Sequence, residues 1–100
     1  MEIMIKQNGN SLDVGIDGRL DTNAAPELMK KLEEILVAPV KELILDMENC
    51  DYIASSGLRA ILLAQKKMNG LGGSMLVRNV VDDVMEVFEM TGFADILEFE

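Results

Sequence analysis

The chain opens with two apolar stretches, residues 1–6 and 12–16, which are joined by Asn8-Gly9-Asn10. Within the second stretch, apolar residues alternate with aspartate or glycine, as they do in a strand that buries only one face. An Asn-Gly pair between two such stretches is typical of a tight β-hairpin turn. The pattern therefore predicts that the fold begins with a hairpin.

Three later segments place their apolar residues at helical spacing instead. The first begins near Asn23, and either Thr22 or Asn23 could cap it. The second runs from about Ser55 to Met68 and ends where an Asn-Gly pair follows. The third covers residues 81–88 and carries acidic residues in its first turn, where the helix dipole favours them. The pattern therefore predicts three amphipathic helices.

Short apolar runs at residues 42–47 and 74–77 predict two strands between these helices, and residues 52–53 could extend the first of them. After the third helix, we expect a helical turn at residues 93–96 and a short terminal strand at residues 97–99. These elements complete the order β-β-α-β-α-β-α.

Strands that alternate with helices form parallel pairs with right-handed crossovers, and the opening hairpin adds one antiparallel member. The predicted fold class is therefore α/β, with a mixed, mostly parallel β-sheet packed against α-helices. A chain of 100 residues can close one hydrophobic core and is too short for two. We therefore expect a single domain that spans residues 1–100.

The charge and the apolar pattern of the chain exclude some classes of function. Nine basic and eighteen acidic residues give a net charge of −9, which repels nucleic-acid phosphates and argues against direct binding to them. No apolar run approaches the roughly 18–20 residues that would cross a bilayer, so no membrane insertion is expected. The start of the chain lacks a secretory signal pattern, and the single cysteine, Cys50, cannot form an internal disulfide. A cytoplasmic location is therefore expected.

The residue types argue against an enzyme. The chain has no histidine, so the commonest general base and metal ligand is absent, and nothing is at hand to activate Cys50. Asp46, Glu48 and Asp51 could imitate a cation site, but carboxylates near the end of a strand are usually solvated. We therefore expect no catalytic residue, no metal and no cofactor. A small acidic enzyme would need a deep pocket that holds Asp21, Asp46 and Asp51 together.

Ser55 and Ser56 stand where a strand is expected to end and a helix to begin. One interpretation is a helix cap, because a serine oxygen at this position commonly accepts a backbone N–H. The other is a phosphorylation site, because a phosphate there would meet unpaired amides and the positive end of the helix dipole. The added charge of about −1.5 to −2 would repel an acidic partner and disrupt apolar contacts.

The same helix offers a surface on which a partner could dock. Leu63 has Arg59 and two lysines near it in the helical pattern, and an exposed leucine among basic residues could anchor a partner protein. Leu63 could equally cover the edge of the sheet. The sequence leaves these two alternatives open.

Nearly the whole chain resembles the STAS domain family, and in particular its stand-alone anti-sigma factor antagonists. The resemblance rests on the order and spacing of five segments: GRLD at 18–21 with the alanines and leucine that follow, LILDM at 43–47, YIASSGL at 52–58, GSMLV at 73–77 and VMEVFEMTGF at 84–93.

The resemblance implies a regulatory cycle. The unphosphorylated antagonist would bind an anti-sigma factor that is also a serine kinase, and this would release a sigma factor. Phosphorylation would end the binding, and a serine phosphatase would restore it. The family phosphoserine maps to Ser55 in preference to Ser56, and the residue before it is Ala54 here, where many members have aspartate. The expected partner-binding residues are Asp21, Thr22, Ala54, Ser55, Ser56, Gly57, Arg59 and Leu63.

A second possibility is a STAS module that does not switch. Such a module would serve as a scaffold or accessory part of a transport or sensory complex, and its Ser55 would be only a helix cap.

Overall fold

The predicted hairpin opens the fold in the computed structural model, which describes residues 1–100. Strands β1 (Glu2–Asn8) and β2 (Ser11–Asp17) pair antiparallel, with Asn8 opposite Ser11. The loop between them therefore has only two residues, and its first, Gly9, has a φ of 66°. Glycine adopts this left-handed conformation at little cost, which is why it suits the first loop position.

The rest of the main sheet is parallel, as predicted. Strand β4 (Glu42–Asp46) pairs parallel with β2, and β6 (Ser74–Arg78) pairs parallel with β4. The strand order is β1-β2-β4-β6, so β1 and β6 form the two edges. The predicted mixed, mostly parallel sheet is therefore confirmed.

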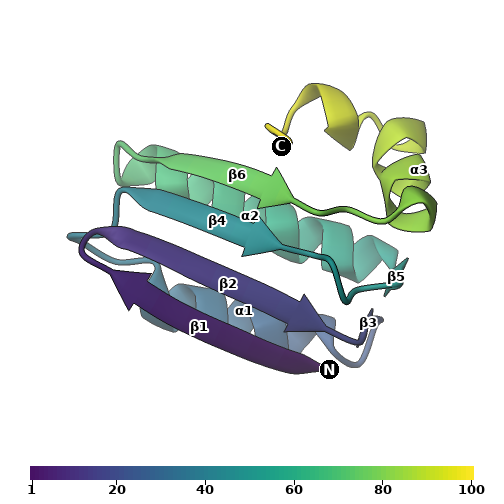
Figure 1. The fold of residues 1–100 in the computed structure, drawn as a ribbon, viewed down its shortest axis with the longest axis horizontal. Helices are drawn as coiled ribbons and strands as arrows, with labels where there is room; N and C mark the ends of the chain where they lie inside the picture. The colour runs from purple at the N-terminus through teal and green to yellow at the C-terminus, as the bar shows by residue number, and fades with distance from the viewer.

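Two helices cover one face of this sheet and leave the other face free of helices (Figure 1). They are α1 (Ala25–Ile35), behind β1 and β2, and α2 (Ser55–Gly70), behind β4 and β6. The helix α3 (Asp82–Met90) and the short 3₁₀ turn η1 (Phe93–Asp95) lie beyond the β6 edge. The core lies between the sheet and the helices. Its residues in β2 alternate as the sequence predicted, and those of β4 and β6 alternate too: Leu12, Val14, Ile16, Leu43, Leu45, Met75 and Val77.

Residues 52–53 do not extend β4, contrary to the prediction. They form a separate strand, β5 (Tyr52–Ile53), which pairs parallel with β3 (Arg19–Leu20) in a small second sheet. The chain turns after β4, because the side chain of Asp46 accepts the amide of Glu48 at 3.0 Å. The two short strands then lie beyond the carboxyl ends of the parallel strands (Figure 1).

The terminal strand is reduced to a single bridge. Phe99 pairs parallel with Val77 of β6, and the ring of Phe99 packs against Phe88 of α3 with 5.4 Å between centroids. This packing holds the last residues beside β6, but only one residue has strand geometry. The predicted strand at residues 97–99 is therefore too long.

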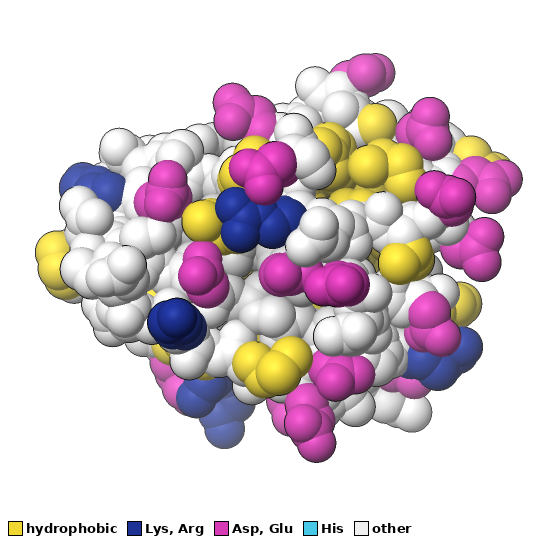
Figure 2. Space-filling model, viewed as in Figure 1, with side chains coloured by type: hydrophobic (Ala, Val, Ile, Leu, Met, Phe, Trp, Pro, Cys, Tyr) yellow, Lys and Arg dark blue, Asp and Glu magenta, His cyan; other side chains and the backbone are white.

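Charge is unevenly distributed over this fold. Five of the nine basic residues lie on α1 and α2, whereas all seven ionisable side chains after Arg78 are acidic. In Figure 2 acidic side chains gather on the side of the molecule that α3 and the C-terminal segment form. The helix α2 therefore offers a basic surface within an acidic chain.

Gly70, the last residue of α2, and Gly73, which follows it, differ in how closely other parts of the chain approach them. Alanine substitutions at these two positions therefore give a matched test of packing. A Cβ on Gly73 would lie 2.4 Å from the backbone oxygen of Lys41, whereas a Cβ on Gly70 would meet nothing within 4 Å. Gly73→Ala should therefore lower the free energy of unfolding by about 2 kcal/mol or more. Gly70→Ala should leave it unchanged or raise it by up to about 1 kcal/mol, because alanine favours the helix. Urea denaturation measures both, and equal effects would contradict this close approach.

Candidate functional site

The start of α2 is fixed by backbone contacts with the small second sheet. The amide of Ala54 donates to the carbonyl of Leu20 at 2.9 Å, and the amide of Leu58 donates to the carbonyl of Ala54 at 3.1 Å. Ala54 itself is extended, with φ −91° and ψ 169°, so the helix begins abruptly at Ser55. These bonds place the serine pair beside the β3–β5 ladder.

The first turn of α2 has unpaired amides. The N–H groups of Ser55, Ser56 and Gly57 have no acceptor within the protein, and no side chain caps the helix. The interpretation of Ser55 as a helix cap is therefore wrong. No acidic residue lies in this first turn, so the positive end of a 16-residue helix is uncompensated.

The two serines differ in their surroundings. Ser55 is exposed, whereas the Oγ atom of Ser56 is buried and has no hydrogen-bond partner. Gly57 is buried as well, and a Cβ there would lie 2.8 Å from Leu20 Cγ and 2.9 Å from Ile53 Cγ1. Gly57 thus allows the helix to approach the β3–β5 ladder.

Asp21 caps the turn that leads into α1, whereas no side chain caps the helix itself, so the prediction that Thr22 or Asn23 would cap it is wrong. The Oδ1 atom of Asp21 accepts the amides of Asn23 at 3.1 Å and Ala24 at 2.9 Å. A turn at residues 22–24 precedes the first helical residue, so the side chain that satisfies these amides lies further back in the chain than expected. Thr22 is exposed and makes no capping bond.

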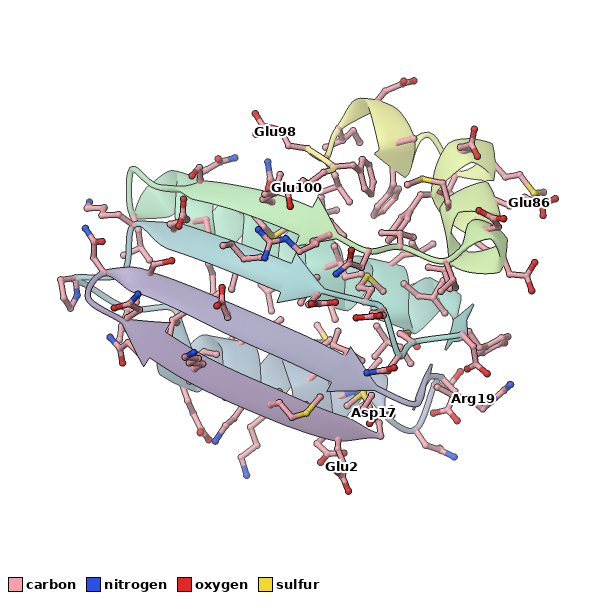
Figure 3. The ribbon with its side chains drawn as sticks, in the orientation of Figure 1. Glu2, Asp17, Arg19, Glu86, Glu98 and Glu100 are labelled. Carbon is pink, nitrogen blue, oxygen red and sulfur yellow. The ribbon has the colours of Figure 1, made fainter.

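The sequence did not predict the contact between Arg19 and Tyr52. The guanidinium of Arg19 lies 4.0 Å from the centroid of the Tyr52 ring, a cation–π contact across the β3–β5 pair. Figure 3 shows Arg19 projecting at the end of the molecule where the short strands lie. The pattern gave no signal for it, because a pair of two-residue strands has no periodicity. The contact with Tyr52 holds a basic group on the short β3–β5 ladder, which leads into Ser55.

The outer face of α2 brings several expected partner-binding residues together. Ser55, Arg59 and Leu63 follow one another at intervals of four residues and so share one side of the helix. Ser55 and Arg59 are exposed, whereas Leu63 is half-buried. Asp21 and Ala54 are half-buried beside them. A protein that docks along α2 would thus contact basic and apolar groups together with the serine.

The three carboxylates that an acidic enzyme would need do not share a pocket. Asp21 lines an open hollow near the N-terminus, and Asp46 lines another of about 230 Å³ on the helix-free face of the sheet. Asp51 lines neither. The Asp46 carboxylate is already bonded to the amide of Glu48 and to the side chain of Asn79. No three acidic or cysteine side chains converge as they would around a metal ion.

Cys50 is buried and belongs to the core. Its thiol donates to the backbone oxygen of Tyr52 at 3.4 Å, and burial raises the pKa of that thiol above its ordinary value.

None of the helices is long and apolar enough to pass through a bilayer. The serine pair therefore lies on an open surface that is built from one helix end and one short ladder.

Comparison with known proteins shows the family to which this α/β domain belongs. A family model described as "STAS domain" matches residues 2–100. An anti-sigma-B factor antagonist of Bacillus subtilis (strain 168) is 30% identical over 102 residues, which covers 98% of this chain and 89% of that protein. The chain belongs to the STAS domain family, as the resemblance implied.

Solved structures agree on the fold. The anti-sigma factor antagonist SpoIIAA in its unphosphorylated form matches with a TM-score of 0.78 and 16% identity, over 99% of this chain and 87% of that one. The phosphorylated form of the Bacillus cell fate determinant SpoIIAA matches with a TM-score of 0.77 and 16% identity, over 99% and 91%. The Bacillus subtilis relative at 30% identity is named for antagonism of an anti-sigma factor, in agreement with the prediction that the chain is not an enzyme.

The two serines should respond differently to alanine. Ser56→Ala removes a buried oxygen without a partner, so the free energy of unfolding should rise by about 1 kcal/mol. Ser55→Ala removes an exposed hydroxyl that caps nothing and should change it by no more than about 0.5 kcal/mol. Urea denaturation of both variants checks this. A loss of about 1 kcal/mol in Ser55→Ala would indicate a cap after all.

The raised pKa of Cys50 predicts an alkaline loss of stability. In the unfolded chain the thiol ionises near its ordinary pKa of 9.0, whereas in the folded protein it keeps its proton to a higher pH. As the pH rises, the unfolded state therefore releases the proton first. The contribution of the thiol to the free energy of unfolding is full below about pH 9 and is lost as the pH rises further. Urea denaturation at about pH 8 and about pH 10 should show a larger loss in the wild type than in Cys50→Ala. Equal losses would contradict a buried thiol.

Proposed function

We propose that the chain is an anti-sigma factor antagonist whose binding is switched off by phosphorylation of Ser55. The observation that carries this proposal is an exposed serine at the start of a long helix whose first three amides are unpaired. Membership of the STAS domain family supports it, as do relatives named for anti-sigma factor antagonism. The proteins of known structure include both a phosphorylated and an unphosphorylated relative.

In the unphosphorylated state, the exposed side of α2 binds an anti-sigma factor, and the sigma factor is released. Thr22, Ser55 and Arg59 contribute exposed groups, and Leu63 contributes a half-buried apolar contact. The basic side chains of α2 favour an acidic partner surface. This docking requires no change of fold in the antagonist, because α2 and the β3–β5 ladder are already in place.

A kinase activity of the anti-sigma factor transfers phosphate to Ser55 and ends the binding. The unpaired amides receive the phosphate, so the folded domain tolerates it. The partner surface meets about −1.5 to −2 added charges at the centre of the contact. A penalty of about 3 kcal/mol raises the dissociation constant more than a hundredfold. A serine phosphatase restores the binding form, and the cycle takes place in the cytoplasm.

The test uses the kinase-type anti-sigma factor of the same genome. With ATP, phosphate should appear on Ser55 in the wild type and in the matched control Ser56→Ala, and should be absent from Ser55→Ala. Peptide mass spectrometry locates the phosphate. Labelling of Ser55→Ala at the wild-type rate would refute the assignment.

The effect on binding is measured with Ser55→Asp. Its negative charge lies at the same point of the surface, so it should weaken binding to the anti-sigma factor by tenfold or more, which corresponds to about 1.4 kcal/mol. Isothermal titration calorimetry with Ser55→Asn as the uncharged control measures this. Equal affinities for the two variants would exclude charge as the cause of release.

A further inference from the structure

Strand β1 has an unpaired outer edge along its whole length. It pairs only with β2 and lies at the margin of the sheet (Figure 1). Asn8 and Ser11 close the two-residue loop as a hydrogen-bonded pair, so every second residue back from Asn8 also bonds to β2. The amides of Ile3, Ile5 and Gln7 therefore point outward and have no partner.

This edge has only part of the usual protection of an edge strand. Such strands are commonly short, interrupted by proline, charged or covered by another segment, and of these β1 has only the charges of Glu2 and Lys6. β1 has seven residues and no proline, and two apolar side chains in its middle, Met4 and Ile5, are 48% and 38% exposed. The other edge is partly covered, because the amide of Val77 in β6 donates to Glu98 and the carbonyl of Val77 accepts from Glu100. β1 is therefore the longer open edge of the sheet.

A groove runs beside this edge, between β1 and α1. Three hollows of about 520, 280 and 270 Å³ follow the strand in order, and neighbouring hollows share Glu27 or Glu34 of α1. Their β1 walls are formed by residues on the helix-facing side of the strand. A strand added to the edge would point every second side chain into these hollows. The residues of β1 and its start that line them are Met1, Ile3, Ile5 and Gln7.

Residues 2–6, Glu-Ile-Met-Ile-Lys, are complementary to themselves when paired antiparallel. If two copies meet with Met4 opposite Met4, then Glu2 lies opposite Lys6 at both ends. Ile3 then lies opposite Ile5, and these are the residues whose amides point outward. A register shifted by two residues would place Glu2 opposite Asn8 and lose both ion pairs. Charge therefore selects this register, and apolar contact and hydrogen bonding are compatible with it.

We propose that β1 pairs antiparallel with β1 of a second copy of this chain and joins the two four-stranded sheets into one. Ile5 of the second copy enters the hollow beside Ile3, and Ile3 of the second copy enters the more apolar hollow beside Ile5. The interface is self-complementary and closes at two copies, because each copy contributes the same β1 edge. The helix α2 lies behind the strands furthest from β1 (Figure 1), so both Ser55 sites stay open in the dimer.

The first test exchanges the charges at the ends of the pairing. Figure 3 shows Glu2 projecting from the outer margin of the sheet, and both Glu2 and Lys6 are exposed and make no ion pair within the chain. Sedimentation velocity over a concentration series should show the wild-type mass rising from 11.0 kDa toward twice that value. Glu2→Lys and Lys6→Glu, which each place like charges opposite one another, should weaken the dimer roughly tenfold.

The combined variant is decisive. Glu2→Lys with Lys6→Glu restores opposite charges at both ends and should recover wild-type affinity, and a mixture of the two single variants should form a heterodimer. General repulsion between acidic chains predicts the opposite for Glu2→Lys, because this change lowers the net negative charge by two. Glu89→Lys on α3 changes the net charge equally, away from β1, and serves as the control.

Hydrogen exchange tests the register residue by residue. The amides of Met4 and Lys6 bond to β2 and should be protected at every concentration, whereas those of Ile3 and Ile5 should become protected only as the dimer forms. A chain that stays monomeric up to about 1 mM would overturn the proposal. So would a dimer in which the combined charge exchange restores nothing, because the pairing would then lie elsewhere or in another register.

Discussion

The hydrogen bond from the amide of Ala54 to the carbonyl of Leu20 joins the start of α2 to the segment that precedes α1, next to the β3–β5 pairing. Around it, Gly57 packs against Leu20 and Ile53 with no room for a Cβ atom. Strands of two residues cannot hold their own position, so the β3–β5 ladder depends on the helix just as the helix depends on the ladder. The exposure of the serine and the free amides of α2 follow from this contact.

The regular parts of the fold could be predicted because their apolar positions record which face is buried. The alternation in β2 and the helical spacing in α1 each extend over enough residues to define a period. β3 and β5 are too short for any period, and their pairing joins Arg19 to Tyr52 across a long stretch of chain. The bonds of Asp21 to the turn before α1 were not predicted either, because that turn depends on its local backbone geometry.

The junction at the candidate site could be predicted from the sequence, but the surroundings of its residues could not. A strand was expected to end and a helix to begin at the two serines, and the structure has this junction there. Which serine faces solvent depends on the rotation of α2 about its axis, and core packing around Gly57 sets that rotation. The same rotation leaves Leu63 half-buried, between the two alternatives that the pattern allowed. Neither property is contained in the local pattern, because both follow from contacts with the rest of the fold.

The unpaired amides at the start of α2 also bear on the protonation of any phosphate held there. The second proton of a phosphoserine dissociates with a pKa of about 6, close to cellular pH. Donors and a positive helix end favour the doubly charged form and lower that pKa. A phosphate on Ser55 would then be almost completely dianionic in the cell, and small drifts in acidity would leave the strength of the signal unchanged.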